Sequence, residues 1–273
     1  MDYPPEYVAA RAVLLDALHA LADHRPAIVV VGAQAVYLHT ARRRRRSGSM
    51  TTAADLALDV ESLGTEPDIT AALASAGFTP GKNPGSWLGE GDVAVDITVV
   101  PSQSGRAKKT ARAARLRGHA DTAARITPGL EPALVDHTPH TLTALDRSDL
   151  RQVRVNVAGP AALLIAKAIK VQERMADTEA EMIRRVKEKD ALDMLRLLQA
   201  VETADLVAGL RRHLASDGAR AVNTRGLDFL KEHGMTPRSG LPSLATAATG
   251  GDRTVSPSFV ALTRALLERM REG

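Results

Sequence analysis

The pattern of apolar residues changes near residue 158, and this change constrains the fold more than any other feature. Before it, short β-branched or alternating runs over residues 28–31, 55–60 and 92–100 predict strands. After Gly159-Pro160 the pattern is helical almost throughout, and proline suits the first turn of a helix. The sequence therefore predicts an α+β fold. An α/β core with a small mixed sheet flanked by helices occupies residues 1–158, and a helical domain occupies residues 159–273.

Further elements follow from the same periodicities. Helices are expected over residues 6–22, 33–40 and 67–76, and a further strand over residues 153–157. Residues 101–150 mix Gly, Pro, Ser, Thr and basic side chains, and within them a helix is expected over residues 107–116.

Composition excludes several classes of site. The 273 residues include no cysteine, so thiol nucleophiles, disulfides and cysteine zinc sites are excluded. No secretory signal pattern and no apolar stretch long enough to span a bilayer is visible. We therefore expect a cytoplasmic protein with no membrane partner.

Basic residues are clustered although the net charge is only +4. Five consecutive arginines, and six cations without an acid between residues 106 and 117, suggest a polyanionic partner. Adjacent like charges repel without a counter-anion, so we favour binding over a merely solvated loop. The predicted RNA-binding residues are Arg42, Arg43, Arg44, Arg45, Arg46, Lys108, Lys109 and Arg112.

Three positions in the first domain suggest phosphate and metal chemistry. Gly32 closes a strand and opens a helix, which brings backbone N–H groups near a phosphate, although such turns are also common as plain connectors. Asp55 lies in the next predicted strand, and Asp96 lies inside an apolar one. A buried carboxylate is costly unless something such as a bound cation compensates it. The alternative is that Asp96 occupies the solvent face of an edge strand.

The first helix of the second domain presents cations along one face. Lys167, Lys170 and Arg174 are spaced i, i+3 and i+7. Lys189-Asp190 and Asp193 follow on a later helix. A solvated face also explains these charges, and we favour that interpretation for Arg174.

The order of these features resembles the polymerase-β-like nucleotidyltransferase superfamily. The lysine helix followed by Lys-Asp-x-x-Asp is similar to the AbiEii-like toxin branch, and the chain also resembles the MenT-type toxins. The resemblance covers roughly residues 28–200. Each motif is short, and their order and spacing give them moderate specificity.

The resemblance implies roles for individual residues. Gly32 takes the glycine turn, Ala33 the second small position and Thr51 the threonine of a Thr-x-Asp-x-Asp pattern. Asp55 and Asp96 become ligands of Mg²⁺. Lys167 and Lys170 contact the nucleotide triphosphate, and Asp190 has a supporting or catalytic role in a cleft between the two domains.

The implied reaction transfers a nucleoside monophosphate from an NTP to an RNA acceptor and releases pyrophosphate. Within the family, the expected acceptor is the 3′ end of transfer RNA, and its extension blocks translation. The chain would then be the toxin of a toxin–antitoxin or phage-defence system, with an antitoxin protein as partner. A protein or small-molecule acceptor is one alternative. A catalytically inactive module that binds RNA or a partner is another.

Position 53 departs from the family pattern, because Ala53 stands where an aspartate is expected. Alanine cannot ligate a metal, so catalysis should be impaired in this chain. Either the protein is a natural pseudoenzyme, or an original aspartate was replaced to silence a toxic enzyme, and we favour the second as a hypothesis. In another register Asp55 is the first carboxylate and Ala57 occupies the second position, with Asp59 a same-face neighbour.

Overall fold

A computed structural model describes residues 3–40, 53–108, 110–175, 181–238 and 240–272. The chain divides into two compact units, each of which is described separately. Unit 1 comprises residues 1–35, 50–130 and 137–158, and unit 2 comprises residues 36–49, 131–136 and 159–273.

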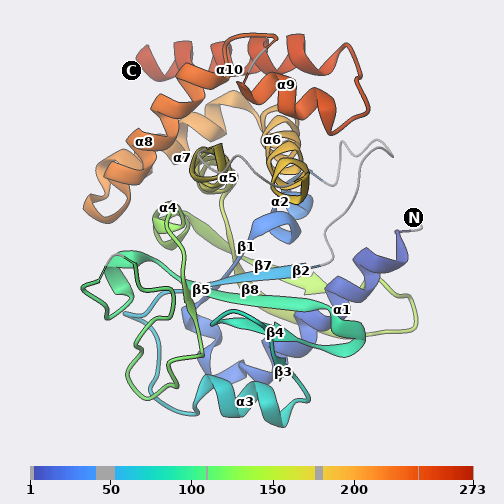
Figure 1. The fold of residues 1–273 in the computed structure, drawn as a ribbon, viewed down its shortest axis with the longest axis vertical. Coiled ribbons are helices and arrows are strands. Elements are labelled where there is room, and N and C mark those ends of the chain that lie inside the picture. The colour runs from blue at the N-terminus through green and yellow to red at the C-terminus, as the bar shows by residue number, and fades with distance from the viewer. Residues whose placement is uncertain (1–2, 41–52, 109, 176–180, 239, 273) are drawn as a thin grey trace. The chain divides into compact units, whose positions relative to one another are not determined.

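Unit 1 is built on a mixed sheet, which has eight strands within the described residues. The strand order is β3-β4-β5-β2-β1-β8-β7 (Figure 1), and β6 pairs with β5 outside this order. β1 pairs antiparallel with β2 and parallel with β8, while β2 pairs parallel with β5. The strands are β1 (Ile28–Val31), β2 (Ala53–Leu58), β3 (Thr79–Pro80), β4 (Ser86–Leu88), β5 (Ala94–Val99), β6 (Arg125–Ile126), β7 (His137–Thr143) and β8 (Gln152–Ala158).

Helix α1 (Pro5–Ala20) covers one face of this sheet by packing against β2, β5 and β8. Its leucines at positions 14, 15 and 18 are fully buried, as are Leu56 and Ile97 of the strands. Removal of this apolar surface from water drives the packing. The remaining helical elements of unit 1 are η1 (Ala22–Ala27), α3 (Ile69–Ser75), η3 (Glu90–Asp92) and η4 (Pro101–Gln103).

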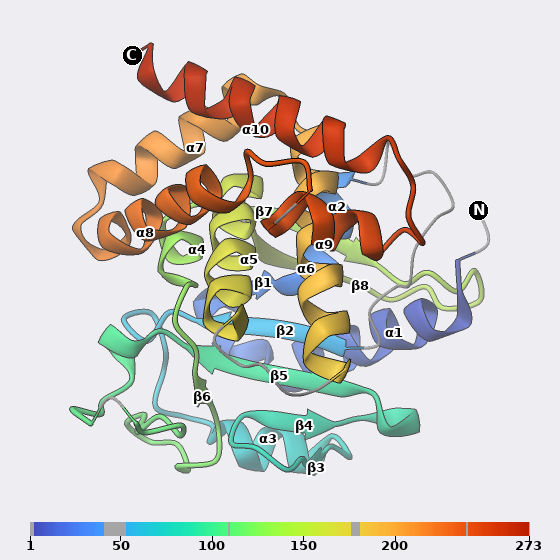
Figure 2. The same cartoon turned by 45° about the horizontal axis from the view of Figure 1, so that its top comes forward.

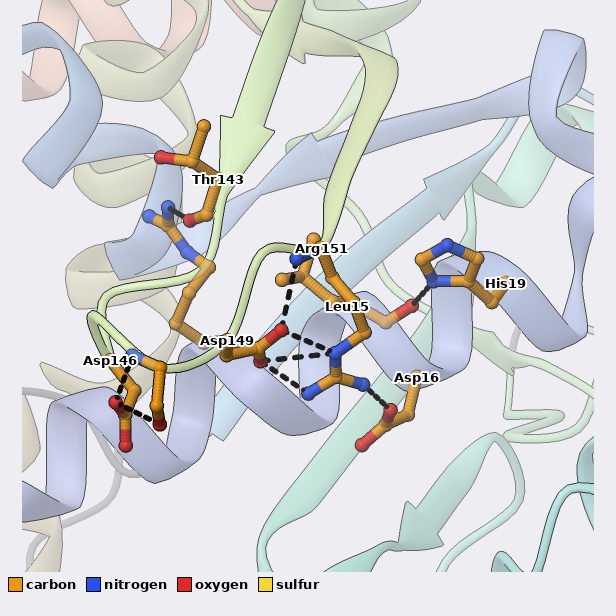
Figure 3. A network of polar contacts seen from close by, with 9 residues as sticks. Leu15, Asp16, His19, Thr143, Asp146, Asp149 and Arg151 are labelled. Atoms are coloured by element: carbon orange, nitrogen blue, oxygen red, sulfur yellow. Dashed lines mark hydrogen bonds and ion pairs between the residues drawn. The ribbon is translucent and has the colours of Figure 1, made fainter.

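Polar contacts attach the β7–β8 hairpin to α1 (Figure 3). Arg151 donates from Nε and Nη2 to both carboxylate oxygens of Asp149, and its Nη1 pairs with Asp16 of α1. The hydrogen bonds from Arg151 hold the pKa of Asp149 at about 2. Arg11 of α1 adds a hydrogen bond of 3.1 Å to the carbonyl oxygen of Thr143.

Unit 2 is helical. α5 (Pro160–Met175) packs against α6 (Glu181–Ala200), α7 (Thr203–Ala215) and α8 (Asp217–His233) through an apolar stripe on each helix (Figure 2). The remaining helices are α4 (Glu131–Val135), α9 (Gly240–Ala247) and α10 (Val255–Arg271), while α2 (Gly32–Thr40) begins in unit 1 and continues into unit 2. Among the described residues, no helix is both long and apolar enough to cross a bilayer.

The structure confirms all but one of the predicted elements and adds several that were not expected. The fold is α+β with a mixed sheet, and the expected strands and helices form within two residues of their predicted starts. The helix expected over residues 107–116 is wrong for the residues of that segment that the structure describes. There Ala113 bridges Arg125, and the Ala114 N–H donates to the Ala124 carbonyl, so pairing between chain segments replaces helical hydrogen bonds. The strands β3, β4, β6 and β7 and the helix α4 were not expected.

Candidate active site

Two carboxylates lie side by side on one face of the sheet of unit 1. Asp55 of β2 and Asp96 of β5 are paired in register on adjacent parallel strands. Paired residues on neighbouring strands point to the same face, and the strands lie about 4.8 Å apart. Both side chains are half-buried. The next pair on this face is Ala53 and Ala94, whose side chains are single methyl groups.

Asp96 does not lie on an edge strand. β5 lies between β2 and β4, and it also pairs with β6. The alternative of a solvated edge position is therefore wrong. Asp96 occupies the interior of the sheet, where a carboxylate requires a compensating positive group.

Gly32 lies directly against the carboxylate of Asp55. Val31 pairs with Asp55, so the turn into α2 passes over this aspartate. Gly32 has φ +66°, and a Cβ at this position would be 2.0 Å from Asp55 Oδ2. Glycine is therefore required both by the backbone conformation and by the close approach of the carboxylate. Gly32 is also the first residue of α2. The first backbone N–H groups of a helix have no partner within the helix, and they attract anions.

Arg125 is a member of this site that the sequence did not reveal. Its Nη2 lies 3.4 Å from Asp96 Oδ2, and the two side chains are 29% and 24% exposed. Arg125 belongs to the two-residue strand β6, which is too short to produce a recognisable pattern. Its guanidinium gives the carboxylate pair a positive neighbour that is also suited to phosphate.

The donor set fits a magnesium ion that shares its ligands with a nucleotide. Mg²⁺ is commonly held by one or two carboxylates together with substrate phosphates and water. Asp55 and Asp96 supply two carboxylates, and Ala53 supplies none. Within the described parts of the chain, no group of three or more His, Asp or Glu side chains is arranged to hold a metal.

Asp59 does not belong to this pair. It follows β2, and its carboxylate accepts hydrogen bonds from Ser62 Oγ, the Glu61 N–H and Gln103 Nε2. These bonds form a turn after the strand. In the alternative register, Ala57 would face the same side as Asp55 but is buried.

A second cluster lies within unit 2 between α5 and α6. Lys167 Nζ donates to Asp190 Oδ1 at 2.6 Å and to Asp193 Oδ2 at 2.8 Å. The Lys167 residue is 5% exposed, Asp190 2% and Asp193 0%. Arg174 and Lys170 approach the other oxygen of Asp190 at 3.1 and 3.6 Å. The three cations of α5 thus share one face, as their spacing predicts.

The charges of this cluster depend on one another. Burial by itself would lower the pKa of Lys167, but Asp190 and Asp193 outweigh burial and raise it. Burial would likewise raise the pKa of Asp190, but Lys167, Lys170 and Arg174 lower it. Burial lowers the pKa of Lys189. An ammonium has three donors, so the Lys167 side chain has one left after its two bonds to aspartates.

The interpretation of Asp190, Asp193 and Arg174 as charges on a solvated face is wrong. Asp190 and Asp193 are buried because α6 packs on α5 along this face, and Arg174 binds Asp190 instead of only water. Arg196 donates to Asp193 at 2.9 Å. Cations outnumber the acids at this position, so the cluster as a whole favours an anionic ligand.

Some of the other predicted site residues are described by the structure and some are not. Thr51, Lys109 and the arginines at positions 42–46 lie outside the described residues. Lys108 and Arg112 are exposed, as a nucleic-acid contact requires. Ala33 is 5% exposed at the start of α2.

Comparison with protein-family models, with curated proteins and with solved structures finds no match for this chain.

Proposed function

We propose that the chain is a nucleotidyltransferase toxin that transfers a nucleoside monophosphate from an NTP to RNA. The observation that supports this most is the in-register pair Asp55 and Asp96, with Gly32 and the start of α2 against Asp55. Such an arrangement combines carboxylates for a cation with backbone N–H groups for phosphate.

The residues of unit 1 have distinct roles in this proposal. Asp55 and Asp96 hold Mg²⁺, which offsets negative charge on the triphosphate and on the leaving pyrophosphate. The N–H groups that begin α2 bind a phosphate, and Arg125 adds positive charge beside it. The acceptor hydroxyl forms a bond to the α-phosphorus as the bond to pyrophosphate breaks, and the hydroxyl proton passes to solvent.

The cluster of unit 2 supports nucleotide binding because it is cationic. We assign to Lys167 and Lys170 a contact with the triphosphate, and to Asp190 the positioning of Lys167 through their 2.6 Å hydrogen bond. Asp193 supports Lys167 from the other side at 2.8 Å. Because both aspartates hold the ammonium in place, little side-chain entropy remains to be lost when an anion binds.

The acceptor we propose is RNA, with the 3′ end of transfer RNA as the expected site. Exposed cations such as Lys108 and Arg112 support an extended anionic acceptor. Extension of that end would block aminoacylation and translation, which agrees with a toxin controlled by an antitoxin protein.

Ala53 favours a second candidate function. The Ala53 side chain points to the face that carries Asp55 and Asp96, where it offers no ligand. A natural Ala53 would make the chain an inactive module that binds RNA or a partner.

Substitution Ala53→Asp distinguishes the two candidates. We expect the substituted protein to transfer label from one radiolabelled NTP to total transfer RNA in the presence of Mg²⁺. The unsubstituted chain should transfer at least about 100-fold less, because a metal ligand contributes several kcal/mol to the transition state. Absence of label on RNA with both proteins would contradict RNA transfer. A screen of protein acceptors would then separate another acceptor from an inactive module.

A further inference from the structure

A separate pocket lies in unit 1 at the edge of η1 and the β7–β8 hairpin. Its volume is about 350 Å³, and its lining includes Arg25, Arg154, Asn156, Ala22, Pro26 and Pro139. This volume is within the range of small-ligand sites, about 300–1,000 Å³. The proposed transfer reaction uses none of these residues.

The pocket is displaced from the two aspartates along the sheet. Asn156 pairs with Val29, and Val29 pairs with Ala57, two residues beyond Asp55. Asn156 therefore points to the same face as Asp55. Two strand spacings across and two residues along the strand give a separation on the order of 12 Å. The pocket and the carboxylate pair are therefore different sites.

The lining of the pocket is positively charged without a matching acid. Two arginines contribute to it, and none of the described residues that line it is acidic. Arg154 is exposed, and its side chain has no hydrogen bond or ion pair within the described structure. The Arg154 guanidinium is therefore available to a ligand, and Arg25 adds a second positive charge to the lining.

Arg25 carries a donor that lacks a partner. Its Nε is buried and makes no hydrogen bond to any described atom, while its Nη2 reaches the Leu18 carbonyl only at 3.5 Å. A buried donor without an acceptor is costly. The side-chain amide of Asn156 offers further donors beside it.

We propose that this pocket binds a phosphate group and, resting on the proposed function for this one point, that a ribonucleotide unit carries the phosphate. The planar guanidinium groups match the oxygens of a phosphate. The apolar surfaces of Pro26 and Pro139 suit the nucleoside that the phosphate carries. The ribonucleotide is either free or part of an RNA strand, and the chemistry recognised is the same.

Binding in the absence of Mg²⁺ tests this site independently of the transfer reaction. The affinity of a fluorescein-labelled single-stranded RNA would be measured by anisotropy, and that of ATP by calorimetry. Arg154→Glu reverses a charge in the pocket, and Asn156→Asp adds a carboxylate without a change of shape. Arg147→Glu is the matched control, because Arg147 is also exposed and is absent from the pocket lining.

We expect both pocket variants to weaken at least one ligand about tenfold, while the control stays within about twofold of the parent chain. Loss with RNA alone identifies a strand as the source of the phosphate, and loss with ATP identifies a free nucleotide. The proposal is overturned when pocket variants and control bind both ligands alike, or when the parent chain binds neither. Transfer activity of the Ala53→Asp protein does not enter this comparison, so the two proposals fail separately.

Discussion

Gly32, directly after β1, lies against the carboxylate of Asp55 in β2. A methyl group at position 32 would meet both a left-handed backbone and the carboxylate, at 2.0 Å from Oδ2. Gly91 provides a matched control, because it has φ +67° and no described atom lies within 4 Å of its ideal Cβ.

We predict that Gly32→Ala lowers the free energy of unfolding more than Gly91→Ala does. The strain of a left-handed alanine costs about 1–2 kcal/mol at either position. The collision with Asp55 adds to this cost at position 32 only. Urea denaturation followed by circular dichroism measures both values. Equal losses would show that Asp55 moves aside freely and is not held against the turn.

The sequence predicted some residues of the site and gave no signal for others. Alternation along residues 92–100 indicated that Asp96 points away from the valines, and the structure places it beside Asp55. Arg125 gave no such signal, because its role arises from pairing between β5 and β6. The resemblance implied a role for Asp190, but the sequence left a solvated face open for Asp190 and Asp193, since it does not show which face of α6 another helix covers.

At the scale of elements, the ion cluster joins α5 to α6. We predict that Lys167→Met lowers the free energy of unfolding by about 3–5 kcal/mol, because two buried carboxylates lose a shared partner. Lys170→Met is the control. Its side chain is 43% exposed and 3.6 Å from Asp190, so the expected loss is below about 1 kcal/mol. Chemical denaturation compares the two, and similar losses would contradict a structural role for the Lys167 bonds.

The same cluster predicts how stability depends on pH. The pKa of Asp190 is lower in the folded state, so its stabilisation is fully present above its unfolded pKa of about 3.9. This stabilisation is lost as pH falls through the lower folded value. Asp149, with a pKa of about 2, acts in the same direction in unit 1.

We therefore expect the urea midpoint of the parent chain to fall as the pH is lowered from about 4 to about 2. The fall should be smaller in Asp190→Asn, which has no carboxylate to protonate at this position. Glu202→Gln provides a control outside the cluster. An identical pH dependence in parent and Asp190→Asn would show that the ion cluster does not contribute to acid sensitivity.

Elements with strong periodicity were predictable, and those formed by pairing were not. α5 and β5 have apolar spacings that favour a single structure. β7 contains His, Thr and Pro residues with few buried positions, and it forms through its antiparallel partner β8. The segment around Ala113 follows the same principle, because its backbone pairs with residues 124 and 125 instead of coiling.

At the scale of the whole molecule, the compact units do not coincide with single stretches of sequence. Unit 2 includes residues 131–136 in addition to residues 159–273. Asp136 shows why: its carboxylate accepts from Arg212 and lies 3.1 Å from Nε2 of the buried His213. These partners are more than 70 residues away in sequence, so apolar periodicity carries no information about their contact.

Asp55 and Asp96 are proposed to hold Mg²⁺ together with a nucleotide, and calorimetry tests this without any need for turnover. Each of the four NTPs would be titrated into the parent chain with and without Mg²⁺, and then into Asp96→Asn. Asp92→Asn is the control, because Asp92 is an exposed acid in the short helix before the same strand.

We predict that at least one NTP binds in a magnesium-dependent manner, and that Asp96→Asn weakens this binding at least about tenfold. Asp92→Asn should bind like the parent chain. Equal magnesium-dependent affinity in the parent chain and Asp96→Asn, or no binding of any NTP, would contradict the claim.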